Sequence, residues 1–186
     1  MIVGVLLAAG SGERFGGDKL LASLGDGTPI GVRSARVLRT AVGRSVAVVR
    51  DADAPLAHLL AAEGLDVLSF DRAADGLGSS LAFGVSRTRG ADGWIVALAD
   101  MPFVEASTFD AVRTSLEAGA LIAAPSFRGR RGHPVGFASI LYPELVRLSG
   151  DVGARALLYA HKEQVVLLEC LDSGVLRDVD TPRDLL

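Results

Sequence analysis

A glycine-rich stretch with two cationic side chains follows the first apolar run of the chain. The apolar run covers residues 2–7 and is typical of a buried strand, and residues 8–19 read AAGSGERFGGDK. Glycines allow backbone N–H groups to face an anion without obstruction from a side chain. Arg14 can bind phosphate oxygens in a bidentate manner, and Lys19 adds a point charge. The stretch therefore predicts a polyphosphate site at the end of the first strand, with a flexible, solvated loop as the alternative.

Neither of the two common phosphate-binding motifs accounts for this stretch. Gly12 and Gly17 have the spacing of a Walker A loop, but Asp18 stands where that motif requires lysine. A dinucleotide-binding motif would begin at Gly10 and Gly12, but it meets Phe15 at the position of its third glycine. What remains is the pattern LAAGxGxRxGxxK, which predicts a different kind of nucleotide-binding loop.

Acidic residues at the ends of two apolar segments could hold a divalent metal ion. Asp100 ends the apolar run 94–99, and a carboxylate is costly to bury there without a partner. Mg²⁺ on a triphosphate is a suitable partner, since Mg²⁺ favours one or two carboxylates together with phosphate oxygens. Asp178 and Asp180 lie on one face if residues 175–179 form a strand. Capping of a following helical turn is the alternative for Asp100 and Asp180, and for Asp100 the residues alone favour neither reading.

Two further segments carry groups suited to ligand binding. Residues 76–81 read GLGSSL and precede a predicted helix, so backbone N–H groups and the helix dipole favour an anion or a polar base edge there. An ordinary serine cap is the alternative. Residues 128–134 read RGRRGHP and form the densest cationic segment of the chain. An anionic ligand would need such charges, and a solvated hairpin tip is the alternative.

Strand-like and helix-like segments alternate through the first two-thirds of the chain. The expected strands cover residues 2–7, 45–49, 65–70, 94–99, 121–124, 135–138, 165–168 and 175–179, and the expected helices cover 29–42, 55–63, 81–87, 105–118, 141–148 and 154–161. This order predicts a Rossmann-like, three-layer α/β/α sandwich with a mostly parallel, doubly wound sheet, in one domain over residues 1–186. Ligands of such sheets lie beyond the carboxyl ends of the strands. The glycine-rich stretch, Asp100 and residues 76–81 all follow strands and are predicted to converge there.

Composition restricts the possible function classes. The chain has 186 residues, 49% of them hydrophobic, and a net charge of −3 with charges of both signs dispersed. This balance argues against nonspecific binding to nucleic acid, which needs a basic face. No apolar run is long enough to span a membrane, and residues 1–10 lack the basic start of a signal peptide. The single Cys170 excludes an internal disulfide and favours a reducing, cytoplasmic compartment.

Five motifs, in order along residues 6–182, resemble those of the molybdenum cofactor nucleotidyltransferases, which contain a MobA-like NTP transferase domain. They are LAAGxGxRxGxxK from Leu7, GLGSSL from Gly76, LADMP from Leu98, GRRGHPVGF from Gly129 and VDTP from Val179. The segment GDVGAR from Gly150 is similar to the same family, although relatives often carry a basic residue where Val152 stands. Within the family, LAAG and the Gly-His-Pro segment resemble the cytidylyl-transferring branch.

The resemblance implies a fold of the nucleotide-diphospho-sugar transferase type and a Mg²⁺-dependent enzyme. The reaction would transfer CMP from CTP to the phosphate of molybdopterin or molybdenum cofactor, with release of pyrophosphate. Lys19, Arg14 and Asp100 would be catalytic, and Asp100 and Asp180 would hold Mg²⁺. The nucleotide site would comprise Leu7, Ala8, Ala9, Gly10, Ser11, Gly12, Arg14, Lys19, Gly78, Ser79 and Ser80. The acceptor site would comprise Arg130, Arg131, Gly132, His133, Pro134, Asp151 and Arg155.

Other activities compatible with the same motifs remain open at this point. A guanylyl- or sugar-phosphate nucleotidyltransferase would share the glycine-rich stretch and the chemistry. A non-catalytic carrier would bind the cofactor and deliver it to an apo molybdenum hydroxylase. Base selectivity depends on backbone contacts around Leu7–Ala9, which the sequence does not reveal.

Overall fold

The computed structural model describes residues 1–10, 15 and 18–185. Its strands are β1 (Ile2–Leu7), β2 (Arg44–Val49), β3 (Asp66–Ser69), β4 (Gly93–Leu98), β5 (Ile122–Phe127), β6 (Arg130–Arg131), β7 (Val135–Ala138) and β8 (Val165–Glu169). Its α-helices are α1 (Ile30–Ala41), α2 (Pro55–Ala62), α3 (Leu77–Ser86), α4 (Ala106–Glu117), α5 (Tyr142–Leu145) and α6 (Arg155–Ala160). Short 3₁₀ turns include η2 (Lys19–Leu21), η3 (Ala73–Asp75), η6 (Ser173–Leu176) and η7 (Pro182–Leu185).

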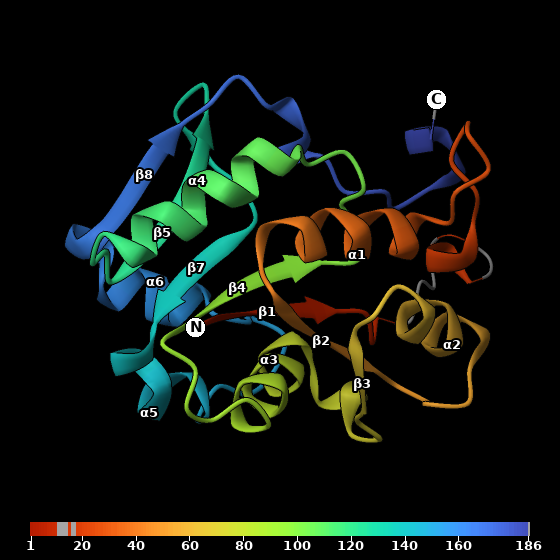
Figure 1. Cartoon of the computed structure of the whole chain (residues 1–186), viewed down its shortest axis with the longest axis horizontal. Coiled ribbons are helices and arrows are strands. Elements are labelled where there is room, and N and C mark those ends of the chain that lie inside the picture. Colours follow the sequence, from red (N-terminus) through yellow and green to blue (C-terminus); the bar gives the residue numbers. More distant parts are fainter. Residues whose placement is uncertain (11–14, 16–17, 186) are drawn as a thin grey trace.

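The strands form one mostly parallel sheet in the order β3-β2-β1-β4-β7-β5-β6, with β8 paired to β5 (Figure 1). β1 pairs in parallel with both β2 and β4, and β2 pairs in parallel with β3. β7 runs antiparallel to β4 and β5. From β1 the chain proceeds to β2 and β3 on one side and then crosses to β4 on the other. β1 and β4 therefore flank a topological switch point, where parallel α/β sheets bind their ligands.

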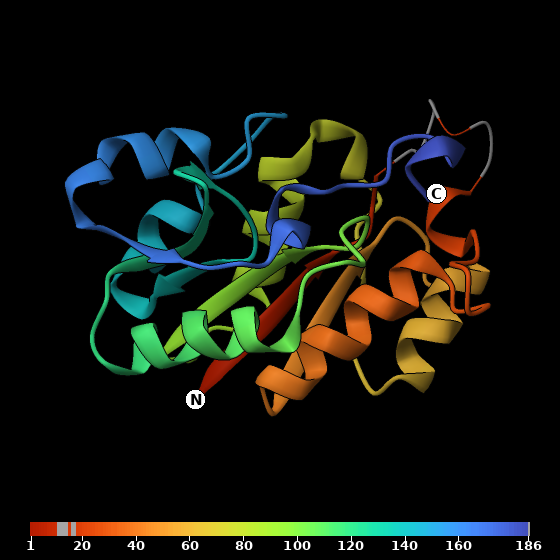
Figure 2. The same cartoon turned by 90° about the horizontal axis from the view of Figure 1, so that it is seen from above.

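Helices cover both faces of the sheet (Figure 2), and side chains alternate along β1 so that they pack against both helical layers. Ile2 and Leu6 pack into a core with α1, α2 and α4, whereas Val3, Val5 and Leu7 pack into a second core with α3, α5 and α6. Because both faces are covered, all six residues of β1 are buried, as expected for a central parallel strand. The predicted doubly wound α/β/α sandwich is confirmed.

The prediction of a strand over residues 175–179 was wrong. Residues 173–176 form η6, and residues 177–180 continue without strand pairing to the described part of the chain. Gly174 lies so close to Phe103 that a Cβ would be 2.1 Å from the Phe103 carbonyl oxygen, and its N–H donates to Asp172 Oδ1 at 2.8 Å. These contacts turn residues 172–180, the return segment, away from the sheet. The Val179 N–H then donates to the Asp100 carbonyl at 2.9 Å.

The helices expected over residues 141–148 and 154–161 are present but shorter than predicted. α5 ends at Leu145 and α6 covers Arg155–Ala160, and two glycines with positive φ, Gly150 at 70° and Gly153 at 59°, lie between them. No helix in the described ranges combines the length and the apolar character needed to cross a membrane.

Candidate functional site

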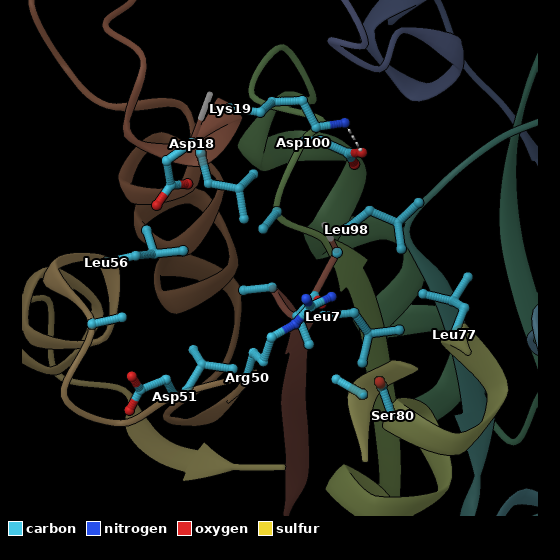
Figure 3. A pocket seen from close by; sticks show the side chains of 18 of the residues that line it. Leu7, Asp18, Lys19, Arg50, Asp51, Leu56, Leu77, Ser80, Leu98 and Asp100 are labelled. Atoms are coloured by element: carbon cyan, nitrogen blue, oxygen red, sulfur yellow. Dashed lines mark hydrogen bonds and ion pairs between the residues drawn. The ribbon is translucent and has the colours of Figure 1, made fainter. Parts of the chain in front are cut away.

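A cavity of about 810 Å³ opens at the carboxyl ends of β1, β2 and β4 (Figure 3). The loop after β1, from Leu7 to Gly10, lies in its wall together with Lys19 and Asp100. Gly76, Leu77 and Ser80, at the start of α3, form another part of the wall. The convergence predicted from the strand order is therefore present among the described residues. Ser11, Gly12 and Arg14, which were also predicted to bind the nucleotide, lie outside the described residues.

Lys19 joins the two predicted metal ligands. Its Nζ donates to Asp100 Oδ2 at 2.9 Å and to Asp180 Oδ1 at 3.1 Å. Burial alone would lower the pKa of Lys19, but the hydrogen bonds and charges of Asp100 and Asp180 outweigh it, so the pKa lies above its ordinary value. The ammonium therefore stays charged, and one cation holds two carboxylates that come from distant parts of the chain.

The return segment places Asp180 beside Asp100. The bond from the Val179 N–H to the Asp100 carbonyl fixes the backbone next to Asp180. Asp184 Oδ2 accepts from the Asp180 N–H at 3.1 Å and from the Thr181 N–H at 2.7 Å, so Asp184 organises the turn into η7. At the start of α4, Asp172 Oδ2 accepts from the Glu105 N–H at 2.9 Å. Asp172 therefore holds the backbone at the start of α4, and Asp100 is not needed for that role.

The carboxylate pair fits a magnesium ion that arrives with phosphate. Two carboxylate oxygens lie about 3 Å from one cationic centre. The described ranges contain no cluster of three or more His, Cys, Asp or Glu side chains able to hold a metal. Mg²⁺ commonly uses one or two carboxylates and takes its remaining ligands from water and substrate phosphates. Asp100 and Asp180 thus match the donor set of a nucleotide-bound Mg²⁺.

The start of α3 provides a narrow wall of the cavity. Gly76 has φ 104°, and a Cβ on it would lie 2.5 Å from Asp151 Oδ1, so only glycine fits there. The Gly78 N–H donates to the Gly150 carbonyl at 2.8 Å. Ser80 lines the cavity, whereas Gly78 and Ser79 are not part of its lining. The loop 149–151 is therefore packed against the segment predicted to contact the base.

The predicted acceptor residues separate into two groups. Asp151 lines the cavity, while Arg130, Arg131 and Arg155 are exposed outside its lining. His133 lies two residues before Val135, which pairs with Val96 in the antiparallel pair β7–β4. Continuing this pairing places His133 near the carboxyl end of β4. Its backbone N–H donates to the Val175 carbonyl at 2.9 Å. The acceptor segment and the return segment are thus joined directly.

The surroundings of His133 keep its side chain neutral. Burial and, to a smaller extent, the charge of Arg131 lower the pKa of His133 to about 4, against the opposing charge of Asp100. The Nδ1 atom is enclosed and has no hydrogen-bond partner among the described groups. The neighbouring Gly132 is held as well, since its N–H donates to the Pro125 carbonyl at 2.8 Å, and the peptide bond between His133 and Pro134 is cis. A neutral imidazole near Asp100 can orient a ligand by hydrogen bonding.

Arg50 is a lining residue that sequence reasoning missed. It follows the buried strand β2, and its Nη2 donates to the Ala9 carbonyl at 3.2 Å. A charged residue directly after a continuous apolar run was the available signal, and the same signal had singled out Asp100 after β4. Figure 3 shows the Arg50 side chain reaching in beside Leu7.

Comparison with known families matches residues 4–165 to a sequence model described as a MobA-like NTP transferase domain. Purine catabolism protein PucB of Bacillus subtilis is 32% identical over 98% of this chain and 93% of its own length. Nicotine blue oxidoreductase of Paenarthrobacter nicotinovorans is 30% identical over 97% of this chain and 92% of its own length. These relatives match the chain almost from end to end.

Among solved structures, Rv0371c from Mycobacterium tuberculosis superposes with a TM-score of 0.85 and 29% identity, covering 98% of this chain and 94% of its own. A manganese complex of the same protein superposes with a TM-score of 0.81. The likeness extends over the whole α/β/α sandwich and supports the fold described above.

Proposed function

The chain belongs to the MobA-like NTP transferase family, and we propose from this premise that it transfers CMP from CTP to the phosphate of a molybdopterin-type acceptor, with Mg²⁺ as its metal. Membership of the family makes the chain a nucleotidyltransferase. The base, the metal and the acceptor are the proposed part. The observation that carries the proposal is the Lys19–Asp100–Asp180 cluster, in which Lys19 and Asp100 line the cavity beside the loop after β1 and Asp180 is joined to them through Lys19.

The reaction consists of one in-line displacement. An oxygen of the acceptor phosphate attacks the α-phosphorus of the triphosphate, and the bond from that phosphorus to the bridging oxygen breaks. Pyrophosphate leaves with the electron pair. The attacking phosphate is already ionised near neutral pH, so no general base is required. This agrees with a His133 that is held neutral and has an enclosed Nδ1.

Each residue of the cluster has a defined part in this scheme. Lys19 donates hydrogen bonds to triphosphate oxygens and neutralises their charge. Asp100 and Asp180 would hold Mg²⁺, which neutralises charge on the transferred phosphate when it is bound. We assign the orientation of the acceptor to His133, which is close enough to Asp100 to be affected by its charge, and to Asp151 in the cavity wall. Catalysis is then positioning plus electrostatics.

The test is pyrophosphate release in a panel of CTP, GTP, UTP and ATP, each with molybdenum-loaded molybdopterin or with a sugar phosphate as acceptor. We expect release with CTP and Mg²⁺. Release only with GTP, or only with a sugar-phosphate acceptor, would contradict the proposed substrates. Tight binding of the molybdenum cofactor without any release would favour a carrier that delivers it to a molybdenum hydroxylase.

Asp180→Asn and Asp178→Asn form a matched pair for the metal ligand. Asp180 contacts Lys19, whereas Asp178 is exposed two residues earlier in the same segment. We expect Asp180→Asn, like Asp100→Asn, to lower kcat/KM roughly 10²- to 10³-fold, the usual effect of removing one electrostatic contact to a transition state. Asp178→Asn should leave kcat/KM near the wild-type value. Equal effects of both variants would remove Asp180 from the site.

A further inference from the structure

Arg50 occupies a position in the cavity that its structural contacts do not explain. It extends β2 by one residue, past five buried positions, and lines the cavity with its side chain. Its recorded partner is the Ala9 carbonyl, at 3.2 Å from Nη2. A guanidinium carries five N–H donors, so one bond to a carbonyl leaves most of them available. None of the ion pairs between described residues includes Arg50, although it lines the same cavity as Asp51, Asp100 and Asp151.

The contact with Ala9 fixes where these donors lie. Ala9 is 7% exposed and follows β1, so this bond holds the guanidinium over the end of β1 while Arg50 itself stays exposed to the open cavity. Figure 3 shows it near the middle of the cavity, between the ends of β1 and β2. A planar group anchored at one edge is pre-organised for hydrogen bonding through its remaining edges.

Arg50 lies on the opposite side of β1 from the metal-binding carboxylate. The local strand order is β2-β1-β4, with Arg50 after β2 and Asp100 after β4. Adjacent strands are about 4.8 Å apart, so the two strand ends are separated by roughly 10 Å. If the reacting phosphate lies beside Asp100 and Lys19, the opposite end of the cavity is left for the nucleoside. The cavity wall at and just after the end of β2 also contains Val49, Ala54 and Leu56, whose small or apolar groups suit the faces of a base.

We propose that Arg50 is a specificity-determining residue that reads the nucleotide base; this inference rests on the proposed nucleotidyl transfer. Arginine hydrogen-bonds best to two adjacent acceptors, as it does with guanine O6 and N7. Cytosine also presents two adjacent acceptors, N3 and O2. Adenine places a donor amino group beside its ring acceptors, and uracil places an N–H between its two carbonyls. Arg50 therefore selects CTP or GTP against ATP and UTP.

The test compares Arg50→Gln with Arg44→Gln by direct binding of the four nucleoside triphosphates as non-hydrolysable α,β-methylene analogues. Arg44 begins the same strand at its other end, where its Nε bonds to Asp66, so it is a matched control away from the cavity. We expect wild type and Arg44→Gln to prefer the cytosine or guanine analogue. Arg50→Gln should lose roughly 5- to 150-fold in affinity for the preferred analogue, the range for one bidentate contact, and much less for the adenine and uracil analogues.

Arg50→Lys separates base reading from charge. Lysine keeps the charge but lacks the planar donor pair, so it should not restore discrimination among the bases. Equal loss for all four analogues in Arg50→Gln, or full rescue by Arg50→Lys, would assign Arg50 to phosphate binding or to support of Ala9 and would overturn the inference. Unchanged affinities would overturn it as well. If wild type binds none of the four analogues, the proposed function itself fails. This result differs from every outcome that overturns only the role of Arg50, because those outcomes require a wild type that binds nucleotide.

Discussion

At the scale of single residues, Lys19 contacts both of the carboxylates that we propose as metal ligands. Its ammonium bonds to one oxygen of each, so a Mg²⁺ ion bound to the same pair would lie close to the ammonium and be repelled by it. Arrival of a triphosphate resolves the conflict, because phosphate oxygens provide new acceptors for Lys19. The metal is therefore expected to enter the site together with the nucleotide.

Lys19→Met should change metal and nucleotide affinity in opposite directions. Without nucleotide, we expect Mn²⁺ to bind at least about tenfold more tightly, because two charges about 4 Å apart near a surface repel by a few kcal/mol and each 1.4 kcal/mol is a factor of ten. Triphosphate affinity should fall. Calorimetric titration measures both, with Lys162→Met, an exposed lysine on another element, as the control. Unchanged Mn²⁺ affinity in Lys19→Met would place the ion elsewhere.

The sequence indicated the residues of this cluster but not how they are arranged. Glycine spacing and terminal carboxylates singled out Lys19, Asp100 and Asp180. Their mutual bonds join positions 81 and 161 residues apart, which no local pattern encodes. Arg50 was missed for a related reason, since an arginine after a strand is usually solvated, and only the position of the Ala9 carbonyl shows that this one is directed into the cavity.

At the scale of elements, the return segment decides whether the site is complete. Its anchor is Asp172, which is 5% exposed and accepts three hydrogen bonds, from the Glu105 N–H, the Thr108 hydroxyl and the Gly174 N–H. These bonds attach the segment to the start of α4. Eight residues later the same segment supplies Asp180, so Asp172 would position the proposed metal ligand without touching it.

Asp172→Ala should destabilise the fold and also weaken activity. Three donors lose a charged acceptor, and we expect a loss of about 2–4 kcal/mol in the free energy of unfolding, measured by urea denaturation. Asp178→Ala, an exposed change in the same segment, should stay within about 0.5 kcal/mol of wild type. At a temperature where Asp172→Ala is still folded, its kcat should be lower than that of Asp178→Ala. Equal kcat values would show that Asp172 stabilises the fold without positioning Asp180.

The strands that could be predicted from the sequence are those in which a continuous run of buried apolar residues marks the element. β1, β2 and β4 are continuous apolar runs that are buried on both faces, and the sequence placed each within a residue or two. The return segment has the same kind of composition around Val175, but it packs through Gly174 against a carbonyl instead of pairing with a strand. Hydrophobicity alone cannot distinguish these two ways of burying a valine.

At the scale of the whole molecule, His133 links the stability of the fold to pH. Its pKa of about 4 in the folded chain lies below the ordinary value of 6.5. Between these two values the unfolded chain binds more protons than the folded chain, so stability falls as the pH drops from 6.5 to about 4. The burial that keeps His133 neutral therefore also makes the fold sensitive to acid.

His133→Gln should remove this part of the pH dependence. We expect the loss of unfolding free energy between pH 6.5 and pH 4 to be smaller than in wild type by about 2–3 kcal/mol. Urea denaturation at several pH values measures the difference. His58→Gln, a change at an exposed position on α2, should retain the wild-type dependence. An unchanged pH dependence in His133→Gln would show that the pKa of His133 is about the same in the folded chain as in the unfolded chain.

The bond between Val179 and Asp100 joins a late part of the chain to a much earlier one. Lys19 and Asp100 are synthesised long before the return segment, and the backbone acceptor for His133, at Val175, also belongs to that segment. A chain that ends at a premature stop codon between Asp100 and Asp180 would contain Arg50, Lys19 and Asp100 but would lack the second carboxylate partner of Lys19. Truncation anywhere along this stretch would therefore remove one of the two proposed metal ligands.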